Sequence, residues 1–237
     1  MKQTMRITKK LETLQESIGL HFKNVELLEN AFVHRSYHNE NRDFLLPSNE
    51  KLEFLGDSVL SLVTSVHLYT TYPEYKEGDY TDIKAAIVNT TSLYEAAKPL
   101  GLGDYLYLSK GEQENNGREN VSILADCFEA LIGAIYLEHG FDTAYTFIKT
   151  FLFRDVLDTI VQKRLYLPAK NILQEHYQDK YKKLPTYKVL SESGPEHNKT
   201  YLVGVFDNEQ KLGEGSGKSK KQGEEEAARS ALQKLGI

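Results

Sequence analysis

Acidic residues recur at helical spacing in an otherwise apolar segment. In NEKLEFLGDSVL, residues 49–60, the acids are Glu50, Glu53 and Asp57, three and four residues apart. A helix with this spacing carries all three carboxylates along one face. A solvated acidic face near a helix N-terminus would explain this segment if it stood alone.

A second segment favours a different explanation. VSILADCFEALIGAIYLE, residues 121–138, predicts a helix that is apolar on all sides and therefore buried. Its carboxylates, Asp126 and Glu129, share one face, and no lysine or arginine lies between Ile123 and Leu137 to neutralise them. Because a buried carboxylate needs a partner, the two segments together predict a cluster that binds cations.

The ligand set limits which cation fits. The carboxylates of the two segments offer oxygen donors only, which favours Mg²⁺, or Mn²⁺, over zinc. A di-iron helical bundle also uses glutamates on facing helices, but its recurrent motif is Glu-x-x-His. That motif is absent, since Gly56 follows Glu53 at the third position and Ile132 follows Glu129. The di-iron alternative would predict iron in the purified protein. Gly56 itself predicts close helix packing beside the acids.

Composition sets the broad class. The chain has 237 residues, a hydrophobic content of 40% and a net charge of −5, enough for one large domain or two smaller ones. The single cysteine, Cys127, excludes an intrachain disulfide and fits a reducing cytoplasm. No signal peptide or membrane-spanning segment is apparent, so no membrane association is expected.

The hydrophobic pattern predicts a mainly helical region followed by a small α+β region. Residues 11–160 read as helices, with Pro73 ending the first acidic helix, a polar loop at 108–120, and one final helix over 142–162. From residue 168 the order is helix, three strands, helix within about 70 residues, which suits an independent domain.

Lysines begin the last predicted helix. Lys218, Lys220 and Lys221 oppose the helix dipole there, although they would suit a phosphate partner bound at the free N–H groups. A solvated lysine cluster is the simpler alternative. A double-stranded RNA binder also needs contacts to two minor grooves, which Asn171, Gln174 and Glu175 on the first helix and His197 in the GPEHN loop could provide.

These motifs, taken in order, resemble the ribonuclease III family of bacterial type. HRSYHNE (34–40), NEKLEFLGDSVL and SKGEQENNGRENVSILADCFEALIGAIYLEHG (109–140) are similar to its catalytic signatures, and the tail is similar to its C-terminal double-stranded RNA-binding domain. The resemblance implies a catalytic domain over 8–141, a helical extension and linker to about 167, and the RNA-binding domain over 168–237.

The resemblance also implies residue roles. Glu53, Asp126 and Glu129 match metal ligands, Asp57 and Glu129 match the catalytic positions, and Glu50 matches an acid with a less direct role. RNA-contacting positions are matched by Gln174, Glu175, His197, Lys218, Lys220 and Lys221. The family enzyme is a homodimer that uses Mg²⁺ and no small-molecule cofactor. It cuts double-stranded RNA to 5′-phosphate and 3′-hydroxyl ends, in processing ribosomal RNA precursors and other structured RNAs such as mRNA and tRNA.

Two further expectations follow. Gly223 stands where the family's last helix normally has alanine, which predicts a helix weaker by up to about 1 kcal/mol. A second function class also stays open, namely an RNA-binding protein that keeps the fold and does not cut. That class predicts salt-sensitive duplex binding with no metal-dependent product.

Overall fold

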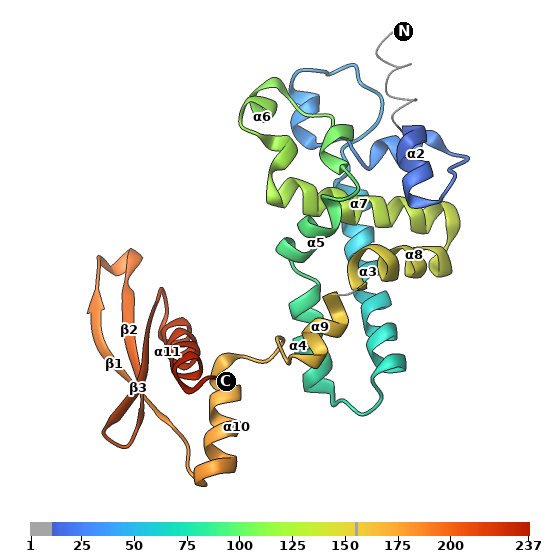
Figure 1. Ribbon diagram of the computed structural model, residues 1–237. Coiled ribbons are helices and arrows are strands. Elements are labelled where there is room, and N and C mark those ends of the chain that lie inside the picture. Colours follow the sequence, from blue (N-terminus) through green and yellow to red (C-terminus); the bar gives the residue numbers. More distant parts are fainter. Residues whose placement is uncertain (1–10, 155) are drawn as a thin grey trace. The chain divides into compact units, whose positions relative to one another are not determined.

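The computed structural model describes residues 11–154 and 156–237 (Figure 1). The chain divides into two compact units, with the boundary in the sequence between Tyr166 and Leu167. The first unit is helical, and the second combines three strands with two helices. The helix-rich region followed by an α-β-β-β-α region is therefore confirmed. Residue 8, the predicted start of the catalytic domain, lies outside the described residues.

Two long helices form the centre of the first unit. These are α3 (Glu50–Thr71) and α7 (Val121–His139), which cross in Figure 1. α3 ends just before Pro73, and α7 ends at Gly140, whose φ of 81° suits glycine. Asn120 caps α7 by accepting hydrogen bonds from the N–H groups of Ser122 and Ile123.

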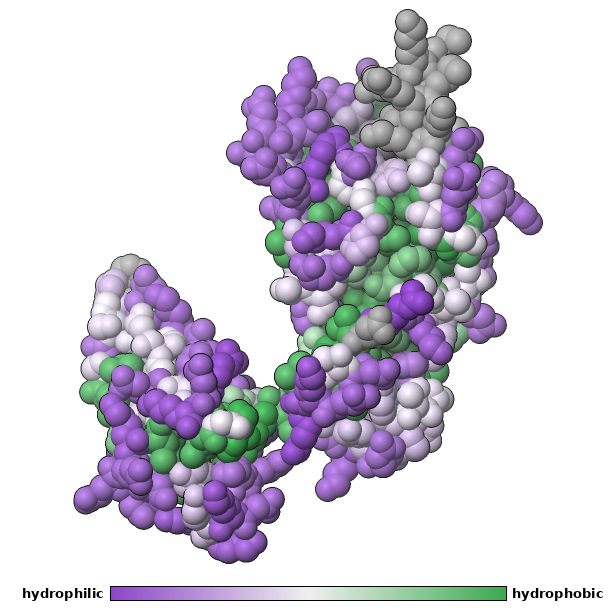
Figure 2. All heavy atoms as spheres, in the orientation of Figure 1, coloured by the Kyte–Doolittle hydropathy of each residue, from purple (hydrophilic) through white to green (hydrophobic). Residues whose placement is uncertain are grey.

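Shorter elements surround this pair. A helix covers residues 11–18, and the remaining elements are α2 (Val25–Asn30), η1 (Arg35–Asn39), α4 (Glu77–Ile87), α5 (Thr90–Ala97), η2 (Leu102–Tyr105), α6 (Lys110–Glu114), η3 (Gly117–Glu119) and α8 (Phe141–Ile148). Figure 2 shows hydrophobic residues gathered around the positions of α5, α7 and α8, with hydrophilic residues over the outer parts. Among the described residues, no helix combines the length and apolar character needed to cross a membrane.

Two local predictions were wrong. The segment 108–120 is not a plain loop, because Ser109 caps the short helix α6 by accepting a hydrogen bond from the N–H of Glu112. The single helix predicted over 142–162 is interrupted by a π-helical turn, η4 (Lys149–Phe153), before α9 (Val156–Gln162). Leu152 and Phe153 within this turn are both buried.

The second unit is a three-stranded antiparallel sheet with two helices. Helix α10 (Ala169–Tyr181) precedes β1 (Thr186–Ser193), η5 (Glu196–Asn198), β2 (Thr200–Asp207) and β3 (Gln210–Gly217), and α11 (Lys220–Leu235) follows. The strand order is β1-β2-β3. Leu173 and Tyr177 of α10, Val205 of β2 and the alanines of α11 form its core.

Gly223 has a packing role that the sequence pattern did not indicate. A Cβ atom at this position of α11 would lie 2.7 Å from Cγ2 of Val203 and 3.3 Å from the carbonyl oxygen of Tyr201. The helix therefore approaches β2 more closely than an alanine would allow without a shift. Glycine therefore permits close packing here that an alanine side chain would obstruct.

The connection between the units is short. Tyr166 is buried and packs edge-on against Tyr75 of the first unit, with ring centroids 6.3 Å apart. Ala169 is also buried, and its N–H donates to the carboxylate of Glu225 on α11, 2.6 Å away. Only Leu167 and Pro168 separate these two fixed points.

Candidate active site and RNA-binding surface

Helices α3 and α7 touch through glycines. A Cβ atom on Gly56 would overlap the main-chain carbonyl oxygen of Glu129, and one on Gly133 would overlap the carbonyl oxygen of Leu52. The two main chains are therefore in direct contact at this crossing. The predicted role of Gly56 in close helix packing is confirmed, and Gly133 shares it.

The crossing brings three carboxylates together. Glu53 of α3 and Asp126 and Glu129 of α7 each offer an oxygen, and these oxygens all lie within 4.8 Å of one another. All three side chains are partly buried, and among the described residues they form the one group of three such ligands. Asp57 lies on the next turn of α3, is exposed, and is not part of the group of three.

Burial and mutual repulsion raise the pKa values of these acids. The pKa of Glu129 is raised to about 8, first by burial and then by the charges of Asp57, Asp126 and Glu53. Burial is also the main cause of the raised pKa of Glu53 and of Asp126. The effect of Asp57 on Glu129 indicates that the fourth acid lies close to the other three.

A carboxylate group of this kind is chemically suited to a cation. Three acids that resist ionisation together would be stabilised by a divalent ion, because its charge favours their ionised forms. The donors are oxygens only, as Mg²⁺ and Mn²⁺ prefer, and no histidine belongs to the group.

Asn49 and Cys127 tie the two helices to one neighbouring carbonyl. The buried side chain of Asn49, just before α3, donates from Nδ2 to the carbonyl oxygen of Ala31 at 3.2 Å. The thiol of Cys127 on α7 donates to the same oxygen at 3.7 Å. Cys127 is fully buried, and burial raises the pKa of its thiol, which suits a structural role.

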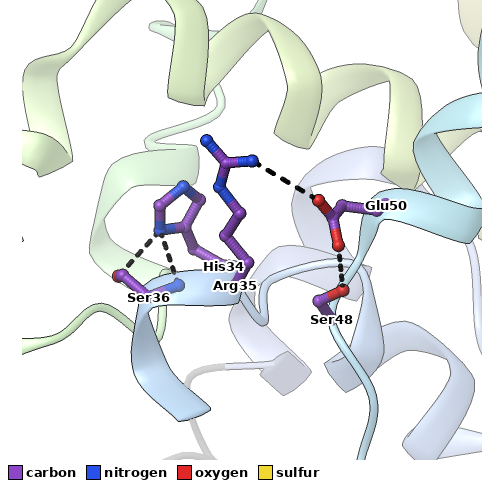
Figure 3. Close-up of polar contacts among 5 residues, drawn as sticks. All are labelled: His34, Arg35, Ser36, Ser48 and Glu50. Carbon is purple, nitrogen blue, oxygen red and sulfur yellow. Dashed lines mark hydrogen bonds and ion pairs between the residues drawn. The ribbon is translucent and has the colours of Figure 1, made fainter. Parts of the chain in front are cut away.

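A third segment, the motif at 34–40, also helps to position the site (Figure 3). His34 caps η1, since its Nδ1 accepts a hydrogen bond from the N–H of Ser36 at 3.3 Å and lies 2.8 Å from Ser36 Oγ. Ser36 Oγ in turn accepts from the N–H of Ser109 at 3.1 Å, and Glu40 accepts from the N–H of Lys110. The motif thus fixes the segment that leads into α7.

Arg35 and Glu50 form an ion pair at the edge of the acidic group. Nη1 of Arg35 lies 3.7 Å from Oε1 of Glu50, and Ser48 Oγ donates to Oε2 of Glu50 at 2.7 Å (Figure 3). Glu50 is therefore outside the group of three. The reasoning from sequence did not single out Arg35, although its place inside the motif at 34–40 was the available signal.

In the second unit, part of the predicted RNA surface lines one pocket. Asn171, Gln174 and Glu175 of α10 border an open pocket of about 730 Å³ together with Gln178, Asp179 and Leu184. His197 lies in η5, in the loop between β1 and β2, and its side chain is outside the described residues.

The three predicted lysines lie at the start of α11. Nζ of Lys218 donates to Asn198 Oδ1 at 2.8 Å and to Thr200 Oγ1 at 3.3 Å, which joins this helix start to the β1–β2 loop. Lys220 lies 3.9 Å from a carboxylate oxygen of Glu192 and over the ring of Tyr201. Lys221 is exposed. The lysines and the β1–β2 loop therefore form one continuous region.

Comparison with known proteins agrees with this architecture. Residues 24–156 match the family described as "Ribonuclease-III-like", and residues 169–235 match the double-stranded RNA binding motif. The chain is 45% identical to "Ribonuclease 3" of Listeria monocytogenes over 227 residues, covering 94% of this chain and 97% of the relative. It is 42% identical to "Ribonuclease 3" of Bacillus licheniformis, covering 99% and 93% respectively.

A solved structure matches the first unit. The nuclease domain of ribonuclease III from Campylobacter jejuni is similar with a TM-score of 0.57 and 39% identity, covering 62% of this chain and 98% of that structure. Family matches that span both units, together with relatives of nearly equal length, lead to one conclusion: the chain belongs to the ribonuclease III family.

Proposed function

We propose that Glu53, Asp57, Asp126 and Glu129 form the metal-dependent active site with which this member of the ribonuclease III family cleaves double-stranded RNA. The observation that carries the assignment is the convergence of three carboxylates from α3 and α7 within 4.8 Å. The products are 5′-phosphate and 3′-hydroxyl ends, and the substrates are ribosomal RNA precursors and other structured RNAs, including mRNA and tRNA precursors, in the cytoplasm.

The chain's own residues divide the work as follows. Glu53, Asp126 and Glu129 hold divalent cations, with Mg²⁺ preferred and Mn²⁺ able to substitute. When bound, such ions supply an activated water and charge stabilisation for the departing oxygen. Asp57 is exposed beside Glu129 and accepts hydrogen bonds from water at the same site. The raised pKa of Glu129, about 8, keeps its carboxyl group largely protonated in the metal-free protein at neutral pH, so cation binding there displaces a proton.

The second unit holds the RNA. Lys218, Lys220 and Lys221 contact phosphates at the start of α11, where the free N–H groups of the helix also favour anions. Asn171, Gln174 and Glu175 contact one minor groove from α10, and His197 contacts another from the β1–β2 loop. Such shape-based contacts bind duplex RNA with little dependence on its sequence.

A homodimer follows from the surface of α3. Phe54, Leu62, Val66 and Tyr69 lie on this helix with exposed side chains, 77%, 54%, 36% and 71% accessible. Their spacing places them on one side of the helix, opposite the buried positions that face α7. An apolar stripe of this kind needs a partner, and the similar structure from Campylobacter jejuni is described with a region involved in dimer formation.

The test compares the wild-type protein with Glu129→Ala on a long perfect RNA duplex, with Mg²⁺ or EDTA. We expect metal-dependent cutting by the wild type, no cutting by the variant, and equal duplex binding by both. Asp142→Ala, an acid on α8 outside the site, is the matched control and should cut normally. Binding without cutting by the wild type would instead support the non-cutting alternative.

A further inference from the structure

The positively charged side chain of Arg35 lies beside the acidic group, and the proposed RNA-cleavage function assigns no role to it. Arg35 is the first residue of η1, and its side chain is 74% accessible to solvent. Its guanidinium is 3.7 Å from Glu50, too long for a hydrogen bond, and Glu50 is itself 54% accessible. An ion pair this exposed contributes little to stability, so the fold does not require it.

The charge of Arg35 reaches the proposed metal ligands. Burial raises the pKa of Glu53 and of Asp126, and the positive charge of Arg35 opposes the rise in both. Glu50, its ion-pair partner, lies one helical turn before Glu53 on α3. The guanidinium therefore lies beside the acidic group, close enough for its charge to act on two of the proposed metal ligands.

The main chain around Arg35 is fixed by hydrogen bonds, whereas its exposed side chain forms a long ion pair with Glu50. His34 caps the turn through Ser36, and Ser36 is bonded to the N–H of Ser109, so the residues on either side of Arg35 are fixed. Figure 3 shows the His34 ring turned toward Ser36 while the Arg35 side chain extends toward Glu50. The long side chain can exchange one oxygen partner for another with no change in the backbone.

We propose that Arg35 is an RNA-binding residue of the active site: on substrate binding its guanidinium leaves Glu50 and binds a backbone phosphate next to the cleaved bond. A guanidinium fits this task because its planar fork can donate two hydrogen bonds to one phosphate. In the free protein, Glu50 keeps the side chain extended at the site. This inference rests on the proposed function of the acidic group.

The test measures steady-state cleavage of a duplex RNA by the full-length protein at saturating Mg²⁺. For Arg35→Gln we expect KM to rise about tenfold, with kcat changed less than twofold, because one charge-assisted phosphate contact is lost. The slope of log(kcat/KM) against log salt concentration should become shallower by about one. Arg35→Lys should recover part of the loss, since it keeps the charge without the fork.

Arg42→Gln is the matched control, because it removes the same charge from an exposed position seven residues further along. We expect its KM to equal that of the wild type, and an equal rise in both variants would overturn the proposal. A second result would also overturn the proposal: an unchanged KM in Arg35→Gln together with a lower Mg²⁺ concentration needed for activity. Arg35 would then act only by offsetting the negative charge of the acids, without binding a phosphate. If the wild type does not cut at all, the proposed function itself fails.

Discussion

The main-chain carbonyl of Glu129 occupies the space that a side chain on Gly56 would need. The same relationship holds in reverse between Gly133 and the carbonyl of Leu52. The acids of the proposed metal site are thus set by direct contact between two main chains, with no intervening side chain to adjust the distance. Such contacts are less tolerant of substitution than packed side chains are.

Gly56→Ala should therefore damage both stability and activity. The added methyl group meets backbone atoms, which cannot rotate away, so the helices must separate; we expect a loss of about 2–4 kcal/mol in the free energy of unfolding. RNA cleavage should fall more than duplex binding, since the second unit is unaffected. Urea denaturation and a cleavage assay measure the two effects. Gly78→Ala in α4, where the methyl group meets nothing within 4 Å, should be neutral or slightly stabilising.

Stability without metal should depend on the ionisation of Glu129. Its folded-state pKa of about 8 lies above its ordinary value of 4.5, chiefly because of burial. The folded state therefore binds a proton that the unfolded state releases, and stability falls as pH rises from about 4.5 toward 8. The Glu129→Gln side chain cannot ionise. In EDTA at pH 8, the free energy of unfolding of this variant should therefore exceed that of the wild type by roughly 1–2 kcal/mol, after allowance for partial solvent exposure. At pH 5 the two proteins should differ little.

Urea denaturation of both proteins at the two pH values measures this difference. An equal gap between wild type and variant at pH 5 and pH 8 would contradict the prediction. Calorimetric titration with Mg²⁺ provides a second readout: because the ion must displace the proton of Glu129, the apparent affinity of the wild type should rise with pH and level off above about 8.

A charge placed on the exposed side of α3 should separate the proposed dimer. Leu62 is 54% accessible in the single chain, and burying an aspartate at its position in an apolar interface would be costly. Leu62→Asp should remain folded and elute as a monomer in size-exclusion chromatography with light scattering, while the wild type elutes as a dimer. Leu137→Asp, at a leucine of similar exposure on α7, serves as the control and should not change the mass.

Loss of Lys218 should weaken RNA binding through two effects. The side chain supplies a positive charge at the start of α11, and it also holds the β1–β2 loop through Asn198 and Thr200. We expect Lys218→Ala to bind duplex RNA at least tenfold more weakly, with a salt slope shallower by about one. Lys234→Ala, in the last turn of the same helix, should bind as the wild type does. Filter binding at several salt concentrations measures both affinities. An equal loss of RNA affinity in Lys218→Ala and Lys234→Ala would contradict the prediction, because it would show that only net charge matters.

The acidic residues of the site could be predicted because the apolar residues around them in the sequence imply burial, and burying an unpaired carboxylate costs free energy. A helix that is apolar on all sides and carries Asp126 and Glu129 favours a bound cation, and the structure places Glu53, which the sequence also indicated, within 4.8 Å of them. The order of helix, three strands and helix in the second unit could also be predicted, because each element follows its own local hydrophobic pattern.

Features that depend on contacts between distant residues were not predictable. The pairing of Arg35 with Glu50 joins two segments whose relation appears only in the fold. The packing of Gly223 against Val203 could not be predicted from helix propensity, because propensity ignores the neighbouring strand. The helical period of the sequence likewise carries no sign of the π-helical turn at Lys149–Phe153.

The short connection between Tyr166 and Ala169 has a kinetic consequence. Both residues are anchored in their own units, and only Leu167 and Pro168 lie between them in the chain, so a very short linker tethers the two units. Whichever unit meets an RNA first, the other encounters that same molecule at an effective concentration in the millimolar range. A weak RNA contact in either unit then suffices for a long-lived complex.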